Sequence, residues 1–215
     1  MIDRFLDILK KTYVMSEVDA GEFAKLKAKG MKFIIHAYHA NGLGHVSVMK
    51  ASGFFGLMKM DTLMIVPQEK DLPLYSYDRI HAMGNDTLIV ELYDTMTENL
   101  DLSALNEVKD SFKNLPERNP GEHWYDSIRL SQSISKKTKK AHSRELDDMA
   151  LSFFNAYLKA PAKMVTDTKK KAELSTAYVN GLLEQGGPST DVFKKALGEQ
   201  DTARLFRDIL FGTKE

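Results

Sequence analysis

The sequence contains no cysteine among its 215 residues. This absence excludes disulfide bonds, thiolate catalysis, iron–sulfur ligation and cysteine-ligated zinc within the chain. The sequence also lacks the G-x-G-x-x-G and Walker patterns of nucleotide-binding loops and the G-x-S-x-G pattern of hydrolases. Redox chemistry in this protein would therefore depend on electrons that another molecule delivers.

Long apolar runs and an excess of either charge are absent as well. No segment approaches the roughly 18 apolar residues that a membrane span needs, and Asp3 and Arg4 interrupt the first apolar stretch, unlike a signal peptide. We expect a cytoplasmic protein without a membrane partner. With 30 basic and 30 acidic residues, the formal net charge is zero, which argues against a general nucleic-acid binder.

The composition is typical of a soluble globular protein, with 43% apolar and 28% charged residues. A chain of this length can bury a sizeable core, and no internal repeat or obvious linker divides it. We therefore expect one domain over residues 1–215.

Hydrophobic spacing predicts helices at both ends of the chain and strands between them. Short connections between consecutive strands indicate an antiparallel sheet, so the expected class is α+β with helices on the faces of that sheet. Helices are expected over 2–13, 18–29, 102–112 and the chain beyond 134, and strands over 32–38, 46–49, 58–66, 72–78, 79–82, 87–93 and 125–134.

The segment Leu72–Asp78, with the sequence LPLYSYD, has the character of a binding pocket. In a regular strand Tyr75 and Tyr77 share one face, whereas Ser76 and Asp78 lie on the other. A carboxylate at the end of such a run suits a ligand cavity. The alternative is a solvated aspartate that caps the following loop.

Asp61 is unusual because it lies within the apolar strand expected over 58–66. A carboxyl group in a dry pocket has a raised pKa and can act as an acid near neutral pH. The alternative is that Asp61 lies on a solvated face of the sheet. The six histidines are scattered, and His36 and His39 fall on alternate faces of their strand, so no metal site is expected.

Two lysine clusters, at 136–140 and 169–171, are conspicuous on a neutral chain. They are either solvated helix ends and loops or a docking surface for an acidic protein, which electrostatic attraction would steer toward them.

Three stretches in this order and spacing carry a family resemblance: KFIIHAYHANGLGHVSVMKA at 32–51, MDTLMIVPQEKDLPLYSYD at 60–78, and Tyr178 followed by VFKKALGEQDTARLFRDILF at 192–211. Together, over roughly residues 32 to 212, the chain resembles the ferredoxin-dependent bilin reductases and, through them, the red chlorophyll catabolite reductases.

The resemblance implies a three-layer α/β/α sandwich with a central antiparallel sheet and a linear tetrapyrrole held between this sheet and the C-terminal helices. It also implies an oxidoreductase without a bound metal or flavin, which takes electrons from ferredoxin and protons from acids in the pocket. The alternative is a non-catalytic tetrapyrrole-binding or carrier protein with the same fold.

The resemblance also implies roles for individual residues. Asp78 matches the pocket aspartate of the family, Asp61 falls where some members have a catalytic histidine, and Ser47 falls where those members have a glutamate. We therefore expect Asp78 and Asp61 to be catalytic. The expected ligand-binding residues are Ser47, Tyr75, Tyr77 and Met60.

Overall fold

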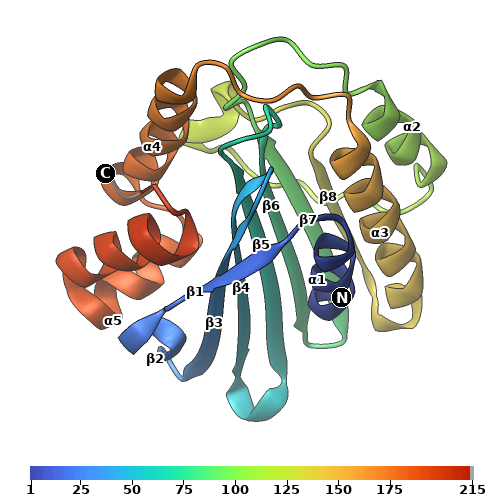
Figure 1. Cartoon of the computed structure of the whole chain (residues 1–215). Coiled ribbons are helices and arrows are strands. Elements are labelled where there is room, and N and C mark those ends of the chain that lie inside the picture. The colour runs from blue at the N-terminus through green and yellow to red at the C-terminus, as the bar shows by residue number, and fades with distance from the viewer. Residues whose placement is uncertain (214–215) are drawn as a thin grey trace.

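The structure is a computed structural model that describes residues 1–213, and its central element is one antiparallel sheet. The strands lie in the order β1-β3-β4-β5-β6-β7-β8, with β2 pairing β3 beside β1 (Figure 1). Their bounds are β1 Met15–Val18, β2 Lys25–Ala28, β3 Met31–Ala40, β4 Gly44–Gly53, β5 Met58–Pro67, β6 Leu74–Ala82, β7 Asn85–Tyr93 and β8 Ile134–Lys139.

Helices cover both faces of the sheet, which gives the three layers that the resemblance implies (Figure 1). One face, here called the α3 face, carries α1 Ile2–Thr12 and α3 Ser143–Lys159, with α2 Ser103–Ser111 packed against α3. The other, the α4 face, carries α4 Thr168–Gln185, α5 Pro188–Arg204 and the π-helical turn η5 Leu205–Leu210. Short 3-10 turns are η1 Gly21–Ala24, η2 Phe54–Gly56, η3 Trp124–Ser127 and η4 Lys140–His142. Among the described residues, no helix has the length and apolar character needed to cross a membrane.

The first helix forms as its apolar spacing predicts. Ile2, Phe5 and Leu9 recur on one side of α1 and are buried against the sheet. Lys10 and Lys11 occupy the last turn, where the partial negative charge of the helix end favours cations.

Two of the expected elements are wrong. The helix expected over 18–29 is replaced by η1 and by strand β2, which pairs with β3 together with β1. Alternation in the short segment Lys25–Ala28 suits a strand, and pairing outweighs its helix propensity. The strand expected over 125–134 is instead η3 and a loop, because the last strand of the sheet is the lysine-rich segment Ile134–Lys139.

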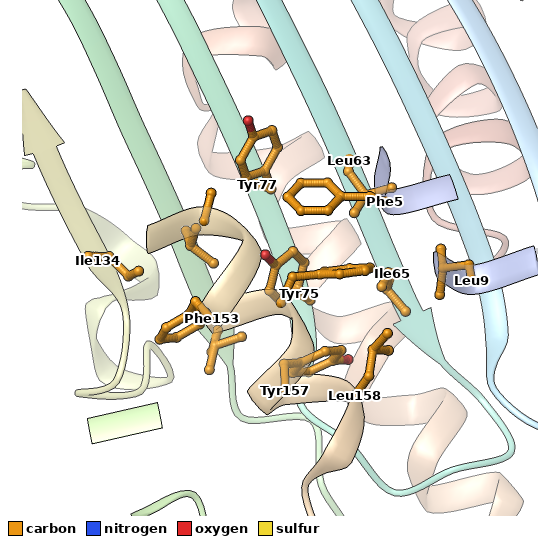
Figure 2. Packing of buried hydrophobic residues seen from close by; sticks show 14 of the residues in the cluster. Phe5, Leu9, Leu63, Ile65, Tyr75, Tyr77, Ile134, Phe153, Tyr157 and Leu158 are labelled. Atoms are coloured by element: carbon orange, nitrogen blue, oxygen red, sulfur yellow. The ribbon is translucent and has the colours of Figure 1, made fainter. Parts of the chain in front are cut away.

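The core on the α3 face is dense and aromatic (Figure 2). Phe5 packs edge-on against Tyr77 with ring centroids 5.0 Å apart, and it lies 4.3 Å from Phe154. Tyr75 lies 4.8 Å from Tyr157, whose hydroxyl donates a hydrogen bond to the carbonyl oxygen of Pro73 at 2.8 Å. Buried aromatic pairs of this kind add stability beyond the area that they bury. The part of this face between β6, α1 and α3 is therefore filled by the protein's own side chains.

Candidate functional site

The α4 face contains a cavity of about 270 Å³ between the middle of the sheet and the C-terminal half of the chain. Strands β5, β6 and β7 form its floor, and α4, η5 and the loop before β8 form its walls. The floor residues are Met60, Met64, Ser76, Asp78, Ile80, Ile89, Glu91 and Tyr93; the walls include Arg118, His123, Tyr125, Tyr178, Leu182 and Phe206.

Strand alternation determines which residues of β6 reach the cavity. Ser76, Asp78 and Ile80 line it, whereas Tyr75 and Tyr77 point to the α3 face. The floor therefore combines apolar side chains with a few polar groups, which is the usual character of a small-molecule site.

Asp78 is the acid in the floor of this cavity. The side-chain hydroxyl of Thr62, directly opposite on β5, donates a hydrogen bond of 2.5 Å to the Asp78 carboxyl group. Burial raises the pKa of Asp78 to about 6, with a further rise from the charge of Glu91, although the hydrogen bond from Thr62 acts to lower it. Asp78 can therefore hold a proton, or release one, close to neutral pH.

Glu91 is the second carboxyl group on the cavity side and is held from two directions. The Tyr93 hydroxyl donates to one of its oxygens at 2.6 Å, and Nη1 of Arg129 lies 3.1 Å from the other. Arg129 is itself fixed by Asp126, at 2.9 Å from its Nη2 atom. This network holds the charge of Glu91 at a constant position relative to Asp78.

Three tyrosines, from β7, the loop before β8 and α4, form one wall. The ring centroid of Tyr93 lies 4.2 Å from that of Tyr178 and 5.4 Å from that of Tyr125. Burial raises the pKa of Tyr93 and Tyr178 well above the ordinary value, and burial followed by the charge of Glu91 raises that of Tyr125 to about 12. All three hydroxyls consequently remain protonated hydrogen-bond donors at neutral pH.

Trp124 fixes the loop that carries Tyr125 against α4. Its ring lies so close to Gly181 that a Cβ atom at this position would be 2.3 Å from it. The indole N–H of Trp124 donates to the carbonyl oxygen of Gly186 at 3.1 Å. A larger residue than glycine would push this loop off the helix and disturb the cavity wall.

Asp61 does not join Asp78, so the expected pair of catalytic carboxylates is wrong. The register of β5 and β6 places Asp61 opposite Arg79 and Thr62 opposite Asp78. Because side chains alternate along a strand, Asp61 points to the α3 face and Asp78 to the α4 face. The residue of β5 that faces the acid is therefore Thr62.

Tyr75 and Tyr77, which we expected to bind the ligand, lie outside the cavity. Both side chains are fully buried in the aromatic core of the α3 face, where Figure 2 shows them beside Phe5 and Tyr157. Their separation from Asp78 onto the other face follows the alternation that the sequence predicts. The structure thus provides no route by which they could contact a ligand in the cavity.

Ser47 lies on the cavity's face of the sheet but is covered by the end of the chain. Its hydroxyl donates to the carbonyl oxygen of Leu210 at 2.7 Å, and the neighbouring His45 ring nitrogen lies 2.7 Å from the carbonyl oxygen of Ile209. The two side chains fasten η5 to β4, so Ser47 does not line the cavity. Met60, the remaining expected ligand-binding residue, does line it.

The two lysine clusters are not wholly solvated. Lys136 of β8 is buried and contacts the carbonyl oxygen of Leu115 at 3.0 Å and Glu117 at 2.5 Å. Lys171 of α4 is buried and lies 3.1 Å from Asp71 and 2.6 Å from the carbonyl oxygen of Leu72. Each cluster therefore contributes one buried lysine, paired with the exposed Glu117 in one case and with the buried Asp71 in the other, and only its other lysines could meet a partner.

The sequence analysis assigned no role to several residues of the site. Glu91 and Tyr93 share a face of β7 by alternation, so this signal could have placed them together with Asp78. Thr62 required the strand register, and Tyr125 and Tyr178 reach the cavity through tertiary packing alone. Within residues 1–213, no three His, Asp or Glu side chains come together in an arrangement that could hold a metal ion.

Comparison with known proteins identifies the class of fold. No protein-family model matches the chain, and no curated protein matches it at the level of sequence. Among solved structures, the fold is that of the bilin reductases, which confirms the resemblance and the expected sandwich at the level of fold. One such structure is phytochromobilin synthase from tomato in complex with biliverdin, with a TM-score of 0.78 and 14% sequence identity over 99% of this chain and 82% of the tomato chain.

Proposed function

We propose that the cavity on the α4 face binds a linear tetrapyrrole and that the protein reduces it with electrons from ferredoxin. One observation carries this proposal. Asp78, with a pKa of about 6, lies in the floor of a partly apolar cavity between the sheet and the C-terminal helices. The similar tomato enzyme was crystallised with biliverdin, a linear tetrapyrrole, which supports the same class of ligand here.

The residues of the cavity suit such a reduction. Met60, Met64 and Ile89 offer apolar surface to the flat pyrrole rings. The hydroxyls of Tyr125 and Tyr178 offer hydrogen-bond donors to the carbonyl groups of the pigment, since the hydroxyl of Tyr93 already donates to Glu91. Each electron added to the pigment increases its basicity. In this proposal Asp78 donates the proton that neutralises the added charge, because its pKa is close to the operating pH. No bound metal or flavin is required in this scheme.

A second candidate function is to bind or carry a tetrapyrrole without reducing it. It is favoured by the positions of two residues that we expected in the site. Asp61 lies on the other face of the sheet, and Ser47 is occupied by the carbonyl oxygen of Leu210. Of the residues that the resemblance aligns with catalytic positions, Asp78 alone reaches the cavity. A protein that keeps one of the three aligned positions in its cavity could retain the pigment and leave it chemically unchanged.

The decisive experiment adds biliverdin and a reduced ferredoxin system under anaerobic conditions and follows the visible spectrum. We expect the pigment band to shift on binding and then to bleach or move as reduction proceeds. Asp78→Asn should bind the pigment but reduce it about 10²- to 10⁴-fold more slowly, the usual contribution of a positioned acid.

Asp61→Asn is the matched control, because it removes a carboxyl group from the neighbouring strand on the opposite face. This variant should turn over like the wild type. Unchanged turnover in Asp78→Asn would disprove the role of Asp78. A shifted band that never changes after reduced ferredoxin is added, in the wild type, would identify a carrier.

A further inference from the structure

One end of the sheet exposes apolar side chains on neighbouring hairpins. The turn between β4 and β5 carries Phe54, Phe55 and Leu57, and the adjacent turn between β6 and β7 carries Met83. Phe55 and Met83 are almost completely exposed, at 108% and 92%. Met58 of β5 pairs with Gly53 of β4 and with Ala82 of β6, so the two turns lie at the same end of the sheet, the lower end in Figure 1. Exposed apolar patches of this kind mark surfaces that contact another body.

The backbone at this end is strained in a way that packing does not explain. Among the described residues, the non-glycine residues with positive φ are Lys29, Phe54, Phe55 and Met83, with φ between 46° and 55°. All four belong to hairpin turns at this end of the sheet, and such turns favour asparagine, aspartate or glycine. Bulky apolar residues in this conformation cost folding energy, which points to a contact outside the chain.

Exposed lysines lie directly behind the apolar turns. Between residues 23 and 60 the sequence has six lysines and no aspartate or glutamate. Lys27 on β2 pairs with Lys32 on β3, and β4 connects Lys32 through Ser52 to Lys59 on β5, so three lysines occupy one row across the sheet. Like charges directly opposite each other destabilise a sheet.

Several of these lysines line a hollow of about 470 Å³. Its walls include Lys25, Lys27, Lys32 and Lys59, with Asp61 as the acidic residue among them and Lys50 already paired with Asp3. Within the part of the chain that the structure describes, the first four make no ion pair or side-chain hydrogen bond. The hollow thus presents unneutralised cations beside the exposed apolar turns.

We infer that this end of the sheet is a membrane-binding surface that docks on anionic lipids. The apolar turns project beyond the lysine row, so they would enter the acyl boundary of a bilayer while the lysines meet the phosphate groups behind it. Aromatic and aliphatic side chains gain free energy by entering that boundary, and each lysine near an anionic surface adds further attraction. The inference does not rest on the proposed function, because the surface lies apart from the cavity.

The chemistry of the surface favours a bilayer over a protein partner. Exposed phenylalanine and methionine fit either, but protein interfaces are enriched in arginine and depleted in lysine. All six cations between residues 23 and 60 are lysines. The exposed hairpin turns can also enter a plane of lipid without a complementary groove on the partner. We had expected no membrane partner because the sequence has no spanning segment, but a spanning segment is not needed for contact from the surface.

The test is co-sedimentation of the full chain with vesicles of phosphatidylcholine alone and of phosphatidylcholine with added phosphatidylserine, at low salt and at about 0.15 M ionic strength. We expect binding to the anionic vesicles that weakens with salt. The triple variant K27Q/K32Q/K59Q should lose about fivefold in partitioning for each lysine removed. The double variant F55S/L57S should lose about tenfold or more.

The control variants carry matched changes elsewhere: V14S/M164S at exposed apolar positions, and K10Q/K11Q/K169Q at exposed lysines. These should bind like the wild type, and all variants should keep the wild-type thermal midpoint. Failure of the wild type to bind anionic vesicles at low salt overturns the inference, as does unchanged binding by F55S/L57S. A different result would be that the wild type does not bind vesicles and the surface variants reduce biliverdin more slowly with ferredoxin. In that case the surface docks an acidic protein and the membrane inference is wrong.

Discussion

The two faces of the sheet are built from the same strands but are filled in opposite ways. On the α3 face, aromatic rings from α1, α3 and β6 pack against one another. On the α4 face, the helices stand away from β5, β6 and β7 and leave a cavity with Asp78 and Glu91 in its floor. Strand β6 supplies both environments, with Tyr77 on one side and Asp78, the next residue, on the other.

The difference shows how the chain separates stability from function. The α3 face provides a rigid support because aromatic side chains fill the space between β6, α1 and α3. The α4 face can accept a ligand because its side chains do not fill it, and the adjoining acid is partly desolvated as a result. Changes on the first face should therefore affect unfolding, and changes on the second should affect ligand binding and proton transfer.

Among the changes that distinguish the two faces, Phe154→Ala on the α3 face should have the largest effect on the free energy of unfolding. Phe154 is completely buried between Phe5 and Tyr75, so its removal leaves a cavity that the neighbours cannot close. The free energy of unfolding should fall by about 3–5 kcal/mol, measured by urea denaturation. The folded fraction should still bind biliverdin with the wild-type affinity. A loss of affinity in the folded protein would show that the two faces are coupled.

The next largest effect is expected from Asp78→Asn, which should change how the stability of the protein depends on pH. Its pKa in the folded state, about 6, lies above the ordinary value of 3.8, so between these values the folded protein binds more protons than the unfolded one. Stability must therefore fall as the pH rises from 4 to above 6. Asp78→Asn removes this loss and should be more stable than the wild type at pH 8, by at most about 3 kcal/mol.

Chemical denaturation of both proteins between pH 4 and pH 8 tests this expectation. The two stability curves should separate as the pH rises from about 4 to above 6, and should then differ by a constant amount up to pH 8. Asp61→Asn, on the opposite face, provides the comparison for loss of a carboxyl group as such. An Asp78→Asn variant that is less stable than the wild type at pH 8 would show that this carboxylate is stabilised by its surroundings.

The smallest effect is expected from Tyr77→Phe. The Tyr77 hydroxyl is buried without a hydrogen-bond partner among the described residues, so it contributes a desolvation cost and no bond. Its removal should leave the free energy of unfolding unchanged or raise it by about 1 kcal/mol. A thermal melt with calorimetry is sufficient. A clear loss of stability would indicate a partner for this hydroxyl, such as a buried water molecule.

The alternation within β6 was predictable from the sequence, but the pairing between strands was not. The periodicity correctly separates Tyr75 and Tyr77 from Ser76 and Asp78. The connection from β5 to β6 covers residues 68–73 and is too long for a tight turn to fix the register. A shift of one residue in the register between β5 and β6 therefore decides that Thr62, and not Asp61, faces Asp78.

The cavity walls could not be predicted for a different reason. Tyr125 belongs to a loop whose position depends on the contact between Trp124 and Gly181, and no local pattern records this contact. The lysine-rich strand β8 was also missed, because a run of charges is typical of solvent-exposed segments. In the structure these residues form an edge strand, where lysines discourage pairing with other chains.

The most direct test of the account is a biliverdin titration that compares two adjacent substitutions. Ser76→Phe places a ring in the cavity, whereas Tyr77→Phe removes only a hydroxyl from the opposite face. We predict that the wild type and Tyr77→Phe shift the visible band of biliverdin equally and that Ser76→Phe, although folded, does not shift it. A wild type that leaves the spectrum unchanged, or a Ser76→Phe variant that binds as well as the wild type, would contradict a tetrapyrrole site on the α4 face.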